Sequence, residues 1–589
     1  MNKFINLFTY IIAICLLFFS NNRSQNKLQI PDTLSGTKFN LTIQKGTINF
    51  YPGFTTNTHG VNGNLLGPTL ILRKGDNITL NVSNTLIDTT TIHWHGMHVA
   101  PENDGGPHTV ILPGTIWRPQ FTVMDNAATY WYHPHLHKKT AEHVTKGVAG
   151  FIIVRDNQEA ALKLPCKYGI DDFPIVVQSR AFDAAKQFIV RSELDSVILV
   201  NGTKNPYLQA PAQVVRLRLL NGSTERTYNF GLKGNKSFYQ IGGDGGLLNS
   251  SLQLTRLRLA PGERAEILVD FNSMQGQSTY LMSYASELAS GIIGARSVGM
   301  GGGLPDYANN KLNGADFNIL RIDVTTPTAN PITSVPLSLI INNPLAASSA
   351  NVTRVLTFTS NGGMMSVAGP FVINGTPFSM EKINYSIPLN NTEIWELRNQ
   401  TLIAHPFHIH DVQFYLLDRN GRQVPSNERA RKDVVLVEPM ETVRFITKFE
   451  DFSNAIVPYM YHCHLLTHED DGMMGQFLVT NPTDVMEEKS SLPNSFSLEQ
   501  NYPNPFNPST IISYQIPTGS HITLKVFDML GKEVATLVDE FKTAGSYNSQ
   551  FSINNLPAGR QGYQLSSGVY FYQLKTSTFM ETKKFVLMK

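Results

Sequence analysis

Short runs of alternating apolar and polar residues, separated by turn residues, recur along most of the chain. Examples are TLILRKGDNITLNVSN (69–84) and AEILVDF (265–271), which are bounded by Gly, Pro and Asn. Successive side chains of a strand point to opposite faces of a sheet, so this pattern is typical of strands with one buried face. No long amphipathic helical pattern competes with it. The pattern predicts an all-β protein.

The length of this strand-rich region indicates several domains. Three Greek-key β-sandwiches of about 150 residues each would fit it, and we place them at residues 28–158, 160–325 and 335–482. After about Thr480 the composition changes to a Ser-, Glu- and Pro-containing linker (483–494). A further strand-rich segment (495–589) follows, and it predicts a small C-terminal β-sandwich.

The N-terminus has the pattern of a secretory signal peptide. Lys3 precedes an apolar run from about Ile11 to Phe19, and a polar segment follows it. This run is too short to span a membrane, so we expect residues 1–24 to be a signal peptide that is cleaved before Gln25. The mature chain then holds two cysteines, Cys166 and Cys463. We expect Cys166 to be a buried, unreactive thiol and no intramolecular disulfide to form.

The charge balance narrows the choice of partners. The chain has 48 Lys and Arg against 46 Asp and Glu, which gives a net charge of +2 with both signs mixed along the sequence. Such a balance argues against a nucleic-acid groove or a polybasic membrane surface. The expected partners are small molecules.

Sixteen histidines are distributed unevenly along the chain, and eight of them form His-x-His pairs. The pairs are His93 and His95, His133 and His135, His408 and His410, and His462 and His464. Residues i and i+2 of a strand share a face, so each pair can present two imidazoles to one metal cluster. Eight imidazoles can hold three copper ions. His405 lies at odd spacing from His408 and can point away from this cluster.

The segment HCHLLTHEDDGMM (462–474) adds a second kind of metal site. Cys463, His468 and Met473 supply the thiolate, imidazole and weak axial thioether of a blue-copper site, and His405 can supply its second imidazole. His462 and His464 flank Cys463 and face the other side of the strand. Adjacent Cα atoms lie about 3.8 Å apart, so a short covalent path would join the two sites.

These segments resemble the signature of the three-domain multicopper oxidases, which include laccases, bilirubin oxidases and copper-efflux oxidases. The resemblance covers roughly residues 35–482. It extends to four segments outside the histidine groups that look like the bacterial branch: GIDDFPIVVQSR (169–180), RLRLLNGS (216–223), GGDGGLL (242–248) and VINGTPF (372–378). It implies three cupredoxin-like domains. It also implies one-electron oxidation of a substrate coupled to the four-electron reduction of O₂ to water.

The family's functional residues all have counterparts in this chain, which implies four copper ions. The type 1 ligands would be His405, Cys463, His468 and Met473, the type 2 ligands His93 and His408, and the type 3 ligands His95, His133 and His464 on one copper and His135, His410 and His462 on the other. Asp104 and Glu469 match acidic residues that relay protons. Electrons would pass from Cys463 through its neighbours His462 and His464. The trinuclear cluster would lie between the first and third domains, with the middle domain as a spacer.

The copper ligands do not identify the reducing substrate. Copper-efflux oxidases carry a Met- and His-rich insert in the third domain. The corresponding residues here, 352–371, have two methionines, Met364 and Met365, and no histidine. We therefore expect a laccase-like oxidase of phenols or aromatic amines that dock near His468. The alternative is a metallo-oxidase of Cu(I), Fe(II) or Mn(II). A copper nitrite reductase would have two domains and no trinuclear cluster, and a non-catalytic surface or division protein would have lost ligands.

The C-terminal segment resembles the sorting domain that the type IX secretion system recognises. The resemblance rests on NYPNPFNPST (501–510), ITLKVFDMLGKEVATLV (522–538), SGVYFYQL (567–574) and the terminal KKFVLMK. AGRQGYQL (558–565) departs from the pattern as an insertion. The resemblance implies export to the periplasm of a Gram-negative bacterium and then type IX secretion to the cell surface or medium. The alternative is an accessory sandwich, for example for carbohydrate binding.

Overall fold

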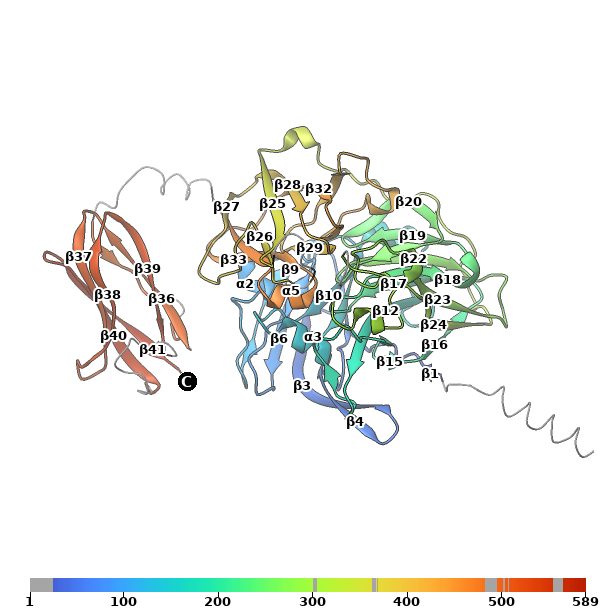
Figure 1. Cartoon of the computed structure of the whole chain (residues 1–589), viewed down its shortest axis with the longest axis horizontal. Coiled ribbons are helices and arrows are strands. Elements are labelled where there is room, and N and C mark those ends of the chain that lie inside the picture. The colour runs from blue at the N-terminus through green and yellow to red at the C-terminus, as the bar shows by residue number, and fades with distance from the viewer. Residues whose placement is uncertain are drawn as a thin grey trace, which may run out of the picture. The chain divides into compact units, whose positions relative to one another are not determined.

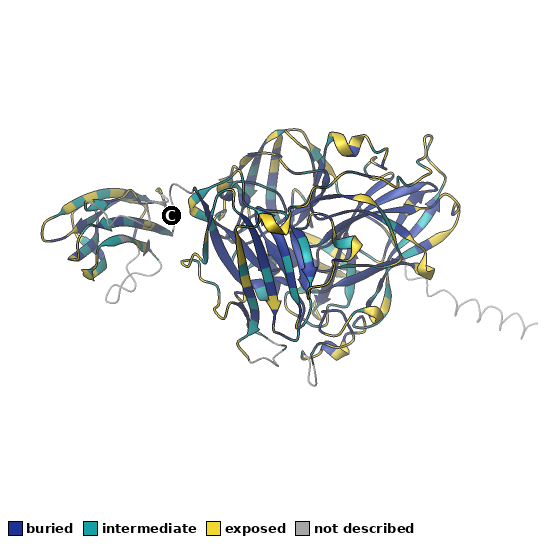
Figure 2. Cartoon of the chain, turned by 90° about the horizontal axis from the view of Figure 1, so that it is seen from above, coloured by how far each residue is buried: buried dark blue, intermediate teal, exposed yellow. Residues whose placement is uncertain are grey.

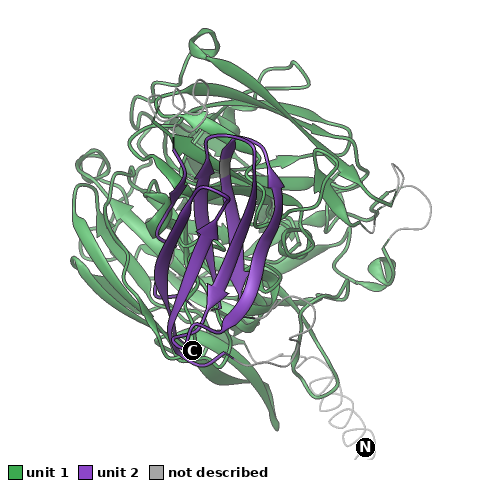
Figure 3. Cartoon of the chain, turned by 90° about the vertical axis from the view of Figure 1, so that its left-hand side faces the viewer, with its two compact units in different colours: residues 1–481 green, residues 482–589 purple. Residues whose placement is uncertain are grey.

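The chain forms two compact units, residues 1–481 and 482–589 (Figure 3). The computed structural model describes residues 25–299, 304–362, 367, 369–481, 495–501, 504–506, 508–553 and 565–588. The predicted signal peptide, the linker, most of the 558–565 insertion, and Met364 and Met365 therefore lie outside the described residues. The predicted all-β class is confirmed (Figure 1).

The first sandwich of unit 1 consists of two sheets around a core that includes Leu41, Trp94 and Ile152. One sheet has the order β2 (Thr33–Ser35), β5 (Thr69–Arg73), β11 (Gly150–Arg155), β10 (Ala128–His133) and β7 (His93–His95). The other has the order β4 (Phe54–Val61), β3 (Lys38–Tyr51), β6 (Asn77–Asn84) and β8 (Ile116–Trp117), with β9 (Gln120–Thr122) also paired to β6.

The middle sandwich has the two sheets with the most strands in the described structure. Its core includes Phe173, Leu217 and Ile267. One sheet has the order β1 (Asn26–Lys27), β16 (Pro206–Pro211), β24 (Asp316–Thr325), β23 (Ser278–Tyr284), β18 (Tyr228–Leu232) and β21 (Leu257–Leu259). The other has the order β15 (Thr203–Lys204), β14 (Val197–Val200), β12 (Asp172–Phe182), β17 (Val214–Asn221), β22 (Arg264–Asp270), β19 (Phe238–Gly243) and β20 (Gly246–Leu254), with β13 (Phe188–Ile189) also on β12.

The third sandwich packs two five-stranded sheets around an aromatic core centred on the fully buried Trp395. One sheet has the order β26 (Phe371–Ile373), β25 (Val352–Ser360), β28 (Thr392–Asn399), β32 (Thr442–Lys448) and β30 (Tyr415–Arg419). The other has the order β27 (Tyr385–Pro388), β34 (Met474–Thr480), β33 (Asn454–Cys463), β29 (His405–Ile409) and β31 (Val434–Val437).

Unit 2 is a small sandwich with its own core, which includes Leu524, Tyr572 and Phe585. A three-stranded sheet has the order β35 (Ser497–Leu498), β36 (Ser509–Ile516) and β39 (Gly545–Ser552). A four-stranded sheet has the order β38 (Glu533–Lys542), β37 (Ser520–Phe527), β40 (Gly568–Lys575) and β41 (Met580–Leu587).

Helices in the described part of the chain are short connections, as the sequence pattern predicts. The α-helices are α2 (Pro101–Asp104), α3 (Thr140–Lys146), α4 (Asn157–Ala160) and α5 (Leu466–Asp470), and the 3₁₀ turns are η1 (Lys233–Asn235), η2 (Ala285–Glu287), η3 (Tyr307–Asn309), η4 (Ala347–Ser349) and η5 (Ser426–Glu428). Among the described residues, none of the helices has the length and apolar character needed to cross a membrane.

Buried residues are concentrated on the strands and exposed residues on the loops (Figure 2). Strands β10 and β12 are buried on both faces, because one face of each joins a sandwich core and the other meets a neighbouring sandwich. The prediction of a buried Cys166 is wrong: this thiol is exposed. It lies in the loop that joins α4 to β12, and no sheet covers it.

A buried ion network joins the first sandwich to the middle sandwich. Arg218 donates to both carboxylate oxygens of Asp172 (2.7 and 3.0 Å) and to Glu266 Oε1 (2.5 Å). Arg216 donates to the same Glu266 and to Glu159 (2.5 Å) of α4, the helix that follows β11 of the first sandwich. All five side chains are at least 94% buried. Removing one partner from such a network leaves an uncompensated buried charge.

We expect Glu266→Gln to lower the free energy of unfolding by about 3–5 kcal/mol, because it removes one anion from this network. Urea denaturation followed by circular dichroism measures the change. The control is Asp323→Asn, which breaks a partly exposed pair with Arg321 and should cost less than about 1 kcal/mol. Equal effects of the two substitutions would contradict the prediction.

Candidate metal centre

Strand register brings the histidine pairs together. In the first sandwich His133 of β10 lies opposite His93 of β7. In the third sandwich His462 of β33 lies opposite His408 of β29. Directly opposite residues of an antiparallel pair have Cβ atoms about 4.5–5.5 Å apart, so each register places two imidazoles side by side.

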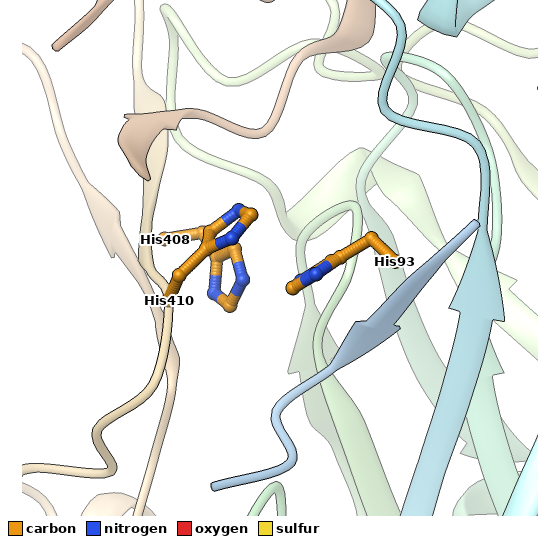
Figure 4. A group of neighbouring side chains, drawn as sticks. All are labelled: His93, His408 and His410. Atoms are coloured by element: carbon orange, nitrogen blue, oxygen red, sulfur yellow. The ribbon is translucent and has the colours of Figure 1, made fainter. Parts of the chain in front are cut away.

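The two sandwiches meet at these strands, and all eight paired histidines gather in one buried cluster. Figure 4 shows His93 approaching from β7 while His408 and His410 approach from the opposite side, His408 from β29 and His410 from just beyond it. Their nitrogens form one possible ligand group, and two further groups are His95 with His133 and His464, and His135 with His410 and His462. The last two triads are the sets that the sequence assigns to the type 3 coppers.

His410 belongs to two of these groups, one with His93 and His408 and one with His135 and His462. Its Nδ1 donates to Asp104 Oδ2 (2.7 Å), while its Nε2 lies 3.4 Å from His462 Nε2. The unprotonated nitrogen therefore faces the triad of His135 and His462. His93 and His408, the other two members of its second group, are the pair that the sequence assigns to the type 2 copper.

The proton positions on the rings fit a metal cluster. The Nδ1 atoms of four rings lie 2.8–3.1 Å from main-chain carbonyls, which can only accept: His93, His133, His408 and His462. A neutral imidazole that donates from Nδ1 is unprotonated at Nε2. The Nε2 atoms of His93 and His408 are buried without a hydrogen-bond partner in the described structure. Buried polar atoms normally have one, so these lone pairs fit a metal ion.

A close pair of nitrogens supports the same conclusion. His135 Nε2 lies 3.1 Å from His462 Nε2, and Nδ1 of His462 already holds the ring proton. Burial lowers the pKa of His135 and His464 to about 3. It also lowers the pKa of five further buried rings well below the ordinary value, namely His95, His133, His405, His408 and His410. The neutral imidazoles that result are the form that binds metals.

The second predicted site forms around Cys463. Its Sγ lies 3.5 Å from His405 Nδ1 and 3.8 Å from His468 Nδ1. Thr401 Oγ1 lies 2.9 Å from the other nitrogen of His405 and fixes this ring. Burial raises the pKa of the Cys463 thiol above its usual range, so a thiolate here needs a bound cation.

Met473, the fourth predicted member of this site, is held close by the main chain. Its carbonyl accepts from Cys463 N (3.0 Å), and its N–H donates to His468 O (2.9 Å). The Met473 side chain is fully buried in the same aromatic core as Cys463. His468 is only partly buried, and Phe371 packs against the rings of both His405 and His468.

The two sites lie on opposite faces of β33. Tyr459, Tyr461 and Cys463 point into the core of the third sandwich. His462 and His464 take part in the two triads on the other side. Strand alternation along this segment therefore places a thiol and two cluster imidazoles on consecutive residues.

Both predicted acidic residues contact the cluster. Asp104 ends α2, and besides His410 it lies 3.3 Å from His93 Nδ1. Gly105 follows it with a φ of +82°, and a Cβ there would lie 1.7 Å from Ile92 O, so only glycine allows this approach. Glu469 lies 3.4 Å from His135 Nδ1 and 3.1 Å from His462 Nδ1.

The sequence prediction missed a third carboxylate, Asp433. Its Oδ1 accepts from His95 Nε2 (3.1 Å), and its main-chain oxygen accepts from His408 Nδ1 (2.8 Å). Arg264 of the middle sandwich donates to both carboxylate oxygens (2.5 Å each). The middle domain is therefore more than the predicted spacer. A charged residue next to the wholly buried strand VVLV (434–437) is the sequence signal that could have indicated Asp433.

The comparisons with known families match almost the whole chain. Multicopper oxidase family models match residues 42–159, 180–309 and 347–483. A secretion system C-terminal sorting domain matches residues 500–588. The chain is 34% identical to the multicopper oxidase mco of Staphylococcus haemolyticus over 478 residues, which covers 78% of this chain and 94% of that protein. It is 30% identical to the cell division protein FtsP of Escherichia coli over 470 residues, 78% and 93% of the two chains.

Solved structures give the same result. A laccase-like multi-copper oxidase CueO from Ochrobactrum sp. superposes with a TM-score of 0.68 and 31% identity, covering 77% of this chain and all of that one. A Campylobacter jejuni multicopper oxidase described as a metallo-oxidase superposes with a TM-score of 0.64 and 26% identity, covering 78% and 96%. The chain therefore belongs to the multicopper oxidase family, copper-dependent oxidoreductases that use O₂, and it carries a C-terminal sorting domain.

Proposed function

We propose that this protein is a laccase-like oxidase with four copper ions per chain, in domains at residues 28–158, 160–325 and 335–482. The observation that carries the proposal is the contact of Cys463 with His405 and His468, while its two neighbours join the histidine triads. Type 1 copper would bind to His405, Cys463, His468 and Met473. Type 2 copper would bind to His93 and His408, and the type 3 pair to the two triads.

Copper in these groups would supply a one-electron acceptor at Cys463 and the four electrons that convert O₂ to two waters. The protein residues supply the path and the protons. Cys463 is bonded through the main chain to His462 and His464, so the electron path would run through covalent bonds from the Cys463 site to the histidine cluster. Asp104 and Glu469 lie against the outer nitrogens of four cluster imidazoles. There they can hold and deliver protons as general acids.

The reducing substrate would approach His468, the partly exposed member of the Cys463 group. A phenol or aromatic amine can give up one electron at the edge of this imidazole without entering the protein. The solved laccase-like relative supports this assignment.

A second candidate, oxidation of metal ions, is favoured by carboxylates near His468. Thr467 donates to Glu225 of the middle sandwich, and Arg191 binds Asp471 with two 2.8 Å hydrogen bonds. Burial, together with Glu225 and Asp195, raises the pKa of Glu193 to about 8. A bound cation would relieve this repulsion, so Cu(I), Fe(II) or Mn(II) could dock here.

Localisation follows from the two ends of the chain. The sorting-domain match suggests secretion or display at the cell surface. We propose that residues 1–24 direct export to the periplasm of a Gram-negative bacterium. The type IX machinery would then recognise residues 495–589.

We expect Cys463→Ser to abolish the blue absorption and O₂ consumption together, because serine cannot provide the soft thiolate ligand. Absorption spectra and an oxygen electrode measure both on the copper-loaded chain. Cys166→Ser is the matched control, because this exposed thiol lies outside both sites and its loss should change neither quantity. Turnover that survives Cys463→Ser would refute the electron path.

We expect Asp104→Asn to lower O₂ turnover by about 100-fold or more, the usual contribution of a general acid. The amide oxygen can still accept from His410, so copper content and blue absorption should persist. The control is Asp451→Asn, a 44% exposed carboxylate that contacts His98. If Asp104→Asn kept more than half of the wild-type turnover, a role in proton delivery would be excluded.

A substrate panel separates the two candidates. A laccase-like oxidase should oxidise phenols far faster than Cu(I), Fe(II) or Mn(II), with O₂ consumption as the common measure. In a metallo-oxidase, the double variant Glu193→Gln, Glu225→Gln should lower kcat/KM for metal ions by about tenfold or more, because the amides cannot ionise to balance the charge of a docked cation. Its activity on neutral phenols should not change. Glu287→Gln, an exposed carboxylate elsewhere in the middle sandwich, is the control.

A further inference from the structure

One turn of the middle sandwich reaches the histidine cluster. Residues 260–264 (APGER) join β21 to β22. Gly262 has a φ of +86°, and a Cβ built on it would lie 3.0 Å from three atoms of the His464 ring. A glycine lets the main chain pack directly on this imidazole, so the middle sandwich forms one wall of the cluster.

Arg264, at the end of this turn, is a fully buried cation whose five N–H donors are all used. Two bind the carboxylate of Asp433 at 2.5 Å each. The other three bind main-chain oxygens of Thr129, Gly262 and Asp244 at 3.0–3.1 Å. An arginine guanidinium offers five donors in a rigid planar fork. The five acceptors therefore hold the Arg264 guanidinium in one position, and the guanidinium in turn fixes the orientation of the Asp433 carboxylate.

Asp433 in turn sets two imidazoles of different copper groups. Its side chain accepts from His95 Nε2 and leaves His95 Nδ1 unprotonated, 3.2 Å from His133 Nε2. Its main chain accepts from His408 Nδ1. The two rings stack with centroids 3.8 Å apart and an angle of 10°. His95 therefore offers a different nitrogen from His408, and the difference depends on Asp433.

We propose that Arg264 is a positioning residue of the trinuclear cluster, contributed by the domain that holds none of the proposed copper ligands. It keeps Asp433 in the position that directs His95 Nδ1 and His408 Nε2 to the metals. The inference rests on the proposed function. Carboxylates that hold metal-binding histidines typically change metal affinity or activity by about 10–100-fold when they are removed.

A structural role alone would predict the same behaviour for any buried arginine of this sheet. Arg218 on the adjacent strand β17 is the matched case, because it is equally buried and binds three carboxylates. Its partners Asp172, Glu266, Glu159 and Thr129 include no imidazole. Arg264→Lys and Arg218→Lys therefore remove similar packing and hydrogen bonding, and only the first change reaches the cluster.

The experiment compares these variants with the wild-type full-length chain after copper loading. Copper content, the electron paramagnetic resonance signal of type 2 copper, and the blue absorption of the Cys463 site are measured, and a chelator titration gives the affinity. We expect Arg264→Lys to keep the blue absorption and to bind the three cluster coppers about 10–100-fold more weakly. Its type 2 signal should change shape. Arg218→Lys should lower the thermal midpoint and leave the spectra unchanged.

Three outcomes overturn the proposal. One is an Arg264→Lys protein with wild-type copper affinity and an unchanged type 2 signal. The second is an equal spectral change in Arg218→Lys. The third is loss of the blue absorption in both Arg264→Lys and Arg264→Gln. In that case the contact between Arg264 and Asp433 would stabilise the whole fold and not the cluster in particular. A wild-type chain that fails to bind four coppers would instead refute the proposed function, so the two failures are distinguishable.

Discussion

The two-residue period of strand β33 is the constraint on which the rest of the site depends. Cys463 faces the aromatic core, and His462 and His464 face the cluster. No other arrangement of three consecutive residues would place a buried thiol and two cluster imidazoles on opposite sides of a single main chain. A one-residue register slip would reverse both faces at once. The opposing register of β29 against β33 therefore secures the chemistry as well as the fold.

Metal binding would impose the second requirement, because each of the eight imidazoles must turn one unprotonated nitrogen to the cluster. The protein meets it with main-chain carbonyls and three carboxylates, Asp104, Glu469 and Asp433, placed behind the rings. Each hydrogen bond fixes one ring proton and so selects the nitrogen left for a metal. Only Asp433 is bound by an arginine at both oxygens. This contact extends the cluster's support from two sandwiches to three.

The sequence predicts the parts of the site that depend on local spacing. The pairing of the histidines follows from their spacing and their grouping from the family resemblance, and the structure brings together the two predicted triads and the Cys463 group, although His135, His410 and His464 lie just past the ends of their strands. The Asp433 to Arg264 contact spans 169 residues, and no local pattern encodes it. Cys166 shows a different kind of error. Free cysteines are usually buried in proteins, but Cys166 lies in a loop and is exposed.

The metal-binding residues do not determine which substrate the protein oxidises. Relatives described as a laccase-like oxidase, a metallo-oxidase and a cell division protein all align with this chain at 26–31% identity, so overall similarity does not distinguish their activities. Under the proposed function, the electron acceptor would be the buried Cys463 group, and the reductant would meet the surface around His468. That surface is built from the third sandwich and from carboxylates of the middle sandwich. The middle sandwich would thus act twice, on the cluster through Arg264 and on substrate choice through Glu193 and Glu225.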